Sequence, residues 1–370
     1  SDVCSSDLLE RVGNPKFLGN IPGVRDVRPV RAVRRSPDPG GFPVFPTAKT
    51  AGNAEASSYG VMLDEMTALA VPPLHERGLT GKGVMIGVLD TGFSNLTDTG
   101  CLKNLRVLHT RNFLRGGSNV SGDRHGSWIL ACIGGKLEGE YMAPAHGASF
   151  LLAVTDDVST ETRADEDRWV AAAEWCDSLG ADIISSSLVY NEFDTAAESY
   201  VKSQMDGRTS LVARAAEIAA SRGILVVNAA GNEGMTPWRI IATPGDAEHV
   251  VAVGALSIPA AGEPSIAPFS SVGPTADGRI KPDVVAPGVE VNIPVVGTTG
   301  QYMVSSGTSL SAPLIAGLCA LLLEARPDWT PAMVMEALKL SARDLGPAGP
   351  DNTYGWGLPN GLAALNASPV

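Results

Sequence analysis

Basic residues are the scarcer charged class in this sequence. The 370 residues include 28 Lys and Arg against 40 Asp and Glu, which gives a formal net charge of −12. Nucleic-acid-binding proteins usually carry a basic surface, so this balance argues against DNA or RNA as a partner. No run of 18 consecutive apolar residues occurs, so we expect no membrane span.

The cysteines form no recognisable metal-binding or disulfide pattern. Three of them, Cys132, Cys176 and Cys319, lie in apolar segments of helical character, and we interpret them as core residues. There is no CxxC pair, no Cys/His cluster and no EF-hand pattern. The five cysteines are Cys4, Cys101, Cys132, Cys176 and Cys319.

The N-terminal region lacks an initiator Met and the apolar core of a signal peptide. Residues 1–8, SDVCSSDL, match the translated end of a common sequencing adapter, and our hypothesis is that they are an artefact. Residues 1–35 hold seven basic and four acidic groups, a balance of +3, against −15 for the remainder. Residues 36–57 are rich in Pro and small residues, which is typical of an exposed linker.

Beyond residue 57, short apolar runs alternate with segments of helical pattern. Apolar runs of this length are expected for buried parallel strands, and their alternation with helices predicts an α/β fold with a mostly parallel sheet. In such folds active residues gather at the carboxyl ends of the strands. The runs are 83–90, 148–155, 181–188, 223–230 and 249–256, and the helical segments are 125–134, 166–179 and 207–221.

Four polar residues occur at strand ends or helix starts. Asp90 ends a strand in VLDTG, His125 opens a helix in RHGSWI, Asn232 follows a strand in AAGNEG, and Ser309 lies in GTSLSAP. Taken singly, each has an ordinary interpretation as a turn former, a packing residue or a helix cap. Asp, His, an amide and Ser are also the residue types that activate a serine nucleophile and stabilise an oxyanion.

These four motifs resemble the signatures of the subtilisin-like serine proteases, the subtilases. The segments 269–288 and 354–365 also match the family's later stretches, so that the resemblance covers about residues 75–365. It implies a three-layer αβα fold over residues 58–370 and the activity of a serine endopeptidase. It also implies a catalytic triad of Asp90, His125 and Ser309, with Asn232 as the oxyanion donor. The other hydroxyls near Ser309, Ser311 among them, we interpret as helix caps.

The resemblance further implies which segments bind the substrate. Val189 stands where the family usually has Gly, and a branched side chain there predicts a narrower pocket that prefers small side chains. Ser127 and Trp128 stand where the family usually has Thr and a small aliphatic residue. The implied substrate-binding residues are Ser187, Leu188, Val189, Ala229, Ala230 and Gly231.

The family also implies a biological setting. Residues 9–35 resemble the end of a prosegment that assists folding and blocks the cleft, so we expect a secreted or cell-envelope protease made as a precursor. We expect a monomer that acts on polypeptides and needs no cofactor for its chemistry; structural calcium is common in the family, but the sequence assigns no ligands. Two alternatives stay open: an inactive subtilase-like binding protein, and a narrow-specificity processing protease or esterase.

Overall fold

The structure, a computed structural model, describes residues 58–259 and 262–369. The predicted adapter artefact, prosegment remnant and linker lie outside the described residues, as does Cys4. Their division from a catalytic domain over 58–370 therefore stays a prediction.

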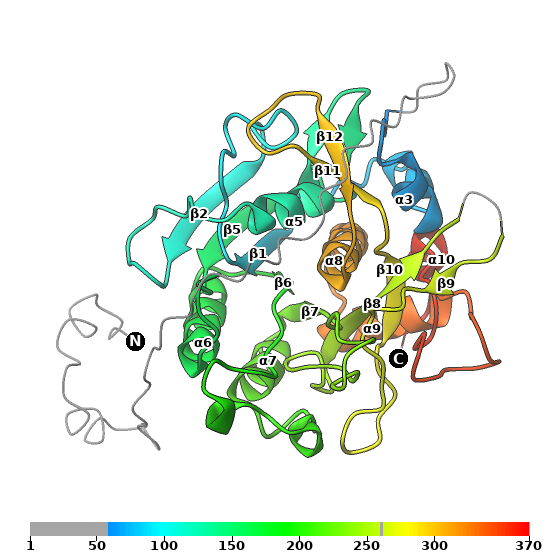
Figure 1. Ribbon diagram of the computed structural model, residues 1–370. Helices are drawn as coiled ribbons and strands as arrows, with labels where there is room; N and C mark the ends of the chain where they lie inside the picture. Colours follow the sequence, from blue (N-terminus) through cyan, green and yellow to red (C-terminus); the bar gives the residue numbers. More distant parts are fainter. Residues whose placement is uncertain (1–57, 260–261, 370) are drawn as a thin grey trace.

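Helices and strands alternate along the described chain, as the sequence predicts (Figure 1). The helices are α3 (Leu63–Ala68), α4 (Pro72–His75), α5 (His125–Gly134), α6 (Arg163–Ser178), α7 (Leu211–Ser221), α8 (Thr308–Ala325), α9 (Pro331–Ser341) and α10 (Gly361–Leu365), with short 3-10 helices η1 (Ala196–Glu198) and η2 (Lys202–Gln204). The strands are β1 (Met85–Asp90), β2 (Arg106–Asn112), β3 (Lys136–Leu137), β4 (Tyr141–Met142), β5 (Ser149–Val154), β6 (Ile183–Ser186), β7 (Leu225–Ala229), β8 (Val250–Ser257), β9 (Ser265–Ile266), β10 (Val284–Pro287), β11 (Val291–Pro294) and β12 (Tyr302–Ser305).

The central sheet is mostly parallel, which confirms the predicted fold class. Its strands follow the order β10-β8-β7-β6-β1-β5-β2, all parallel, and β9 pairs with β8 in the antiparallel sense. All five predicted strands and all three predicted helices are present within a few residues of their expected bounds. The register pairs Leu89 with Ser186 and Ser186 with Asn228, so the carboxyl ends of β1, β6 and β7 meet at one edge.

Strand β2 was not predicted. It is an edge strand whose residues are exposed or partly buried except for the buried Asn112, and its sequence, RVLHTRN, is largely polar. An edge strand with one solvated side needs no continuous apolar run, so it lacks the pattern that identified the central strands.

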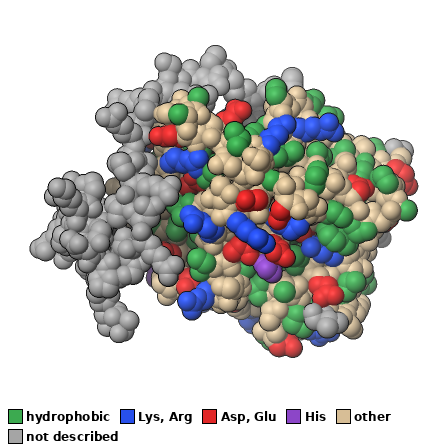
Figure 2. Space-filling view, turned by 90° about the horizontal axis from the view of Figure 1, so that it is seen from below, with side chains coloured by type: hydrophobic (Ala, Val, Ile, Leu, Met, Phe, Trp, Pro, Cys, Tyr) green, Lys and Arg blue, Asp and Glu red, His purple; other side chains and the backbone are tan. Residues whose placement is uncertain are grey.

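Helices cover both faces of the sheet, which gives the three layers. Helices α5 and α8 pack on one face with the larger apolar cluster, and α6 and α7 pack on the other with a second cluster (Figure 1). Figure 2 shows the molecule from the side of α6 and α7, where acidic and basic side chains intermix among apolar and uncharged ones. This mixture is expected for the outward faces of amphipathic helices.

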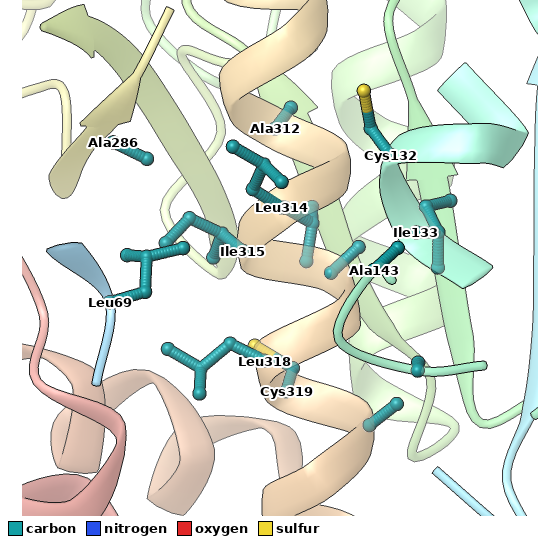
Figure 3. Packing of buried hydrophobic residues seen from close by; sticks show 14 of the residues in the cluster. Leu69, Cys132, Ile133, Ala143, Ala286, Ala312, Leu314, Ile315, Leu318 and Cys319 are labelled. Atoms are coloured by element: carbon teal, nitrogen blue, oxygen red, sulfur yellow. The ribbon is translucent and has the colours of Figure 1, made fainter. Parts of the chain in front are cut away.

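Helix α8 is buried along most of its length. Leu314, Ile315 and Leu318 are fully buried, and α8 packs against α5, from which Cys132 and Ile133 reach the same cluster (Figure 3). Of the described helices, α8 has the length and composition to cross a membrane, with a mean hydropathy of 1.6, but 78% of that window is buried inside the fold. Its apolar character is therefore explained by its place in the core.

The cysteine interpretation is confirmed for the described residues. Cys101, Cys132, Cys176 and Cys319 are buried and free, and no disulfide joins them. Burial raises the pKa of the Cys101 and Cys176 thiols to about 12, so both stay protonated and poorly nucleophilic near neutral pH.

Candidate active site

Asp90 is the last residue of β1, and its side chain is fully buried. Its Oδ1 accepts hydrogen bonds from the Thr91 N–H at 2.7 Å, from the Thr91 hydroxyl at 3.1 Å and from His125 Nδ1 at 2.8 Å. A buried carboxylate needs such donors, because burying an unpaired charge is costly. When Nδ1 donates to Asp90, Nε2 of the neutral ring is free to accept a proton.

His125 is the first residue of α5, and the close packing of α5 on β1 brings its ring to Asp90. The next residue, Gly126, makes this packing possible. A β-carbon at Gly126 would lie 2.4 Å from the Gly92 carbonyl oxygen and 3.0 Å from the Asp90 Cβ. Only a residue without a side chain fits there, so the sequence His-Gly is a geometric requirement of this contact.

The surroundings of His125 favour its protonated form. Its side chain is 28% exposed. Burial lowers the pKa of the ring, but the negative charge of Asp90, its hydrogen bond and the charge of Asp123 raise it by more, so that the pKa lies above its ordinary value. A raised pKa means that the ring takes up a proton more readily than a free imidazole does, which suits a general base.

Ser309 lies in the first turn of α8 and is partly exposed. Helices α5 and α8 pack side by side, so His125 and Ser309 each lie in the first turn of one of two neighbouring helices. The carbonyl oxygen of Ser309 accepts a hydrogen bond from the Ser187 hydroxyl at 2.9 Å. This bond joins the start of α8 to the segment that follows β6.

Asn232 follows β7 and is held by Thr308. Its Oδ1 accepts from the Thr308 N–H at 2.9 Å and from the Thr308 hydroxyl at 3.0 Å. Because Oδ1 takes these donors, the Nδ2 amino group is left to donate elsewhere. A β-carbon at Gly307 would lie 3.8 Å from Asn232 Nδ2, 3.8 Å from the Ser309 nitrogen and 3.9 Å from Asn232 Oδ1, so the Asn232 amide group and the Ser309 N–H flank the same small space.

The predicted substrate-binding residues lie at the same edge of the sheet. Ser187 and Leu188 are buried and continue the chain beyond the end of β6, and Val189 is partly exposed. Ala229 ends β7, and Ala230 and Gly231 follow it and are buried. The Gly231 N–H donates to the Thr308 hydroxyl at 3.2 Å. The structure thus brings all ten predicted site residues to one region around the start of α8.

The predicted role of the other hydroxyls as helix caps is wrong for α8. Gly307 occupies the N-cap position and no side chain caps the helix. Ser311 donates instead to the carbonyls of Ala286 and Pro287, at 3.2 and 3.0 Å. Thr308 bridges Asn232 and Gly231, a contact between residues 76 and 77 positions apart that no local pattern reveals.

Metal binding is not supported by the residues that the structure describes. Within 58–259 and 262–369 no group of three or more His, Cys, Asp or Glu side chains is placed to hold a metal ion. Structural calcium, which is common in the family, therefore has no assigned ligands among these residues.

Comparison with known proteins identifies the family. The model of the family described as "Subtilase family" matches residues 81–357, about three quarters of the chain. The chain belongs to the subtilase family. Membership confirms the resemblance seen in the motifs, and the family is one of serine endopeptidases.

Individual relatives agree with this assignment. The chain is 32% identical over 304 residues to serine protease AprX of Bacillus subtilis (strain 168), covering 76% of this chain and 66% of AprX. It is 30% identical over 300 residues to subtilisin BL of Lederbergia lenta, covering 81% of this chain and 97% of that protein.

A solved structure shows the same fold. The crystal structure of fervidolysin from Fervidobacterium pennivorans, a keratinolytic enzyme related to subtilisin, superposes with a TM-score of 0.69 at 23% identity. The match covers 92% of this chain and 51% of fervidolysin, so this subtilase spans about half of that relative's length.

The contact at Gly126 yields a prediction. Gly126→Ala would push α5 away from β1, so we expect kcat/KM for a peptide substrate to fall at least tenfold and the free energy of unfolding to fall by about 1–3 kcal/mol. The matched control is Gly122→Ala, because a β-carbon there would lie 3.6 Å from the Thr91 carbonyl oxygen, an ordinary contact. Equal activity of the two variants, measured with urea denaturation alongside, would contradict this account of the packing.

Proposed function

We propose that this subtilase hydrolyses peptide bonds through an acyl-enzyme formed on Ser309. His125 acts as the general base, Asp90 orients it, and Asn232 stabilises the oxyanion. The observation that carries the proposal is the 2.8 Å hydrogen bond between His125 Nδ1 and the fully buried Asp90. Together with the position of Ser309 in the first turn of the neighbouring helix, it supports a serine nucleophile activated by an oriented imidazole.

The chemistry follows from these positions. Ser309 Oγ attacks the carbonyl carbon of the scissile bond while His125 Nε2 takes the hydroxyl proton. Asp90 stabilises the imidazolium that results without itself becoming protonated. His125 then gives the proton to the leaving amine as the C–N bond breaks. A water molecule attacks the acyl-enzyme by the same route and restores the Ser309 hydroxyl.

The oxyanion has two proposed donors, Asn232 Nδ2 and the Ser309 N–H. The hydrogen bonds from Thr308 to Asn232 Oδ1 support this role, because they hold the amide with its amino group turned from Thr308. The Ser309 N–H belongs to the first turn of α8, whose unpaired N–H groups and dipole favour negative charge.

The acyl side of the substrate lies along two segments, 187–189 and 229–231. An extended peptide would add to them as a strand, with Val189 narrowing the pocket for the residue before the scissile bond. We further propose that the protein is exported and made as a precursor. The +3 balance of residues 1–35 against −15 for the remainder supports docking of the leader on its own enzyme, an attraction that salt weakens.

Fluorophosphonate labelling tests the nucleophile. We expect a serine-directed fluorophosphonate to form one adduct on Ser309, located by mass spectrometry, and Ser309→Ala to abolish it. Ser311→Ala is the control, since Ser311 is buried and bonded to Ala286 and Pro287. Absence of labelling in folded protein freed of its leader would favour the inactive binding protein instead.

Asn232→Ala tests the oxyanion donor. Loss of such a donor removes an interaction made mainly in the transition state, so kcat should fall on the order of 100- to 1000-fold with little change in KM. Asn366→Ala, at an exposed C-terminal site, should leave both constants unchanged. A rise in KM at constant kcat would remove Asn232 from this role.

Val189→Gly tests the pocket. In a peptide library the parent enzyme should cleave mainly after small residues, and the variant should gain about tenfold in cleavage after Phe or Tyr relative to Ala. Val201→Gly makes the same change at an exposed site and should not alter the preference. Frequent cleavage after Phe or Tyr by the parent enzyme would show that Val189 does not narrow the pocket.

A further inference from the structure

A second carboxylate, Asp123, lies beside the proposed base and has no part in the mechanism above. It precedes His125 by two residues, and its Oδ1 accepts a hydrogen bond from the His125 backbone N–H at 2.8 Å. The same oxygen faces the Thr91 hydroxyl at 3.3 Å.

Asp90 and Asp123 hold His125 from two directions. Asp90 binds the ring through Nδ1, and Asp123 binds the backbone of the same residue. Thr91 lies between the two acids, because its hydroxyl is 3.1 Å from Asp90 Oδ1 and 3.3 Å from Asp123 Oδ1. The three residues thus form one network that joins the end of β1 to the start of α5.

The charge of Asp123 is not cancelled by a neighbouring cation in the described part of the chain. Arg124 is the nearest candidate in sequence, but its guanidinium lies over the Trp128 ring, 5.0 Å from the ring centroid, and no ion pair joins it to Asp123 among the described residues. Asp123 is partly exposed and lines a cleft of about 330 Å³ together with Arg124, Trp128 and Met303.

The groups around the His125 ring make this charge matter. From β1 the ring meets the carboxylate of Asp90, and from its own loop the charge of Asp123 acts on it, while the Arg124 guanidinium lies over the Trp128 ring. From α5 it meets the Trp128 ring edge-on at 6.5 Å. The first turn of α8 brings the uncharged Thr308 and Ser309. Two carboxylates therefore act on a ring that is partly buried.

We propose that Asp123 is a positioning residue for the base, which anchors the His125 backbone and keeps a negative charge beside the imidazolium formed during catalysis. This proposal rests on the function of His125 as the base. Asp123 touches neither substrate nor reacting atoms, so its effect reaches the reaction through His125.

The two carboxylates together raise the pKa of His125 against the effect of burial. The base is the neutral His125 ring, so activity is lost as the pH falls through the pKa of His125. The acid limb of the pH profile of kcat/KM therefore measures this pKa. Removing the charge of Asp123 lowers the pKa. Activity should then persist to lower pH.

The test is Asp123→Asn, which keeps an oxygen for the His125 N–H and removes only the charge. We expect the acid limb of the pH profile of kcat/KM to move to lower pH by about half a unit. At a fixed pH on that limb kcat/KM should rise about threefold, while its maximal value near neutral pH should stay unchanged. The control is Asp328→Asn, an equal charge change at an exposed site beyond the far end of α8, a helix of 18 residues and about 27 Å in length. It should leave the profile in place.

A second measurement separates this proposal from the proposed function. NMR titration of His125 in a Ser309→Ala background reports the ring without any turnover, and Asp123→Asn should lower its midpoint by the same half unit. An unchanged midpoint in NMR and an unchanged acid limb would overturn the role of Asp123. A lowered midpoint, combined with failure of the fluorophosphonate to label the parent protein that keeps Ser309, would uphold the role of Asp123 at the ring and defeat the proposed function alone.

Discussion

The hydrogen bond between Asp90 and His125 is the contact on which the site depends. Asp90 is fully buried at the end of β1, and its Oδ1 accepts from the His125 ring and twice from Thr91, while Oδ2 has no partner among the described residues. A carboxylate in this position is tolerable only with good donors. The hydrogen bond from His125 requires α5 to begin in close contact with the end of β1, and Gly126 permits that approach.

The start of α8 is held by a second set of contacts from other strands. Thr308 binds Asn232 and Gly231 after β7, Ser309 accepts from Ser187 after β6, and Ser311 reaches the carbonyls of β10. These hydrogen bonds tie the ends of three strands to a helix whose remaining turns are mostly buried in the core. The Thr308 and Ser311 hydroxyls in GTSLSAP are therefore explained by tertiary contacts, since a cap alone would need only one hydroxyl.

Much of the fold could be predicted because its central elements are repetitive. A parallel strand covered on both faces must be apolar along its whole length, and β1, β5, β6, β7 and β8 all show this in the sequence. Strand β2 was not predicted, because an edge strand lacks this continuous apolar pattern. The positions of Asp90, His125, Asn232 and Ser309 could be predicted from motifs at strand ends and helix starts. The links through Thr308 and Thr91 could not, because they join residues that only the packing of separate elements makes neighbours.

The sequence by itself determined the class of fold, the order of its elements and the residues that form the candidate site, because hydrophobic periodicity and short motifs are local properties of a chain. Tertiary structure decided which oxygen of Asp90 accepts from His125, which residue fixes the orientation of the Asn232 amide, and that Asp123 binds the backbone N–H of His125. Each of these is a distance between elements. Such a distance depends on how closely a helix approaches a strand. That approach is set by side-chain volumes at contacts such as Gly126, where separate segments of the chain meet.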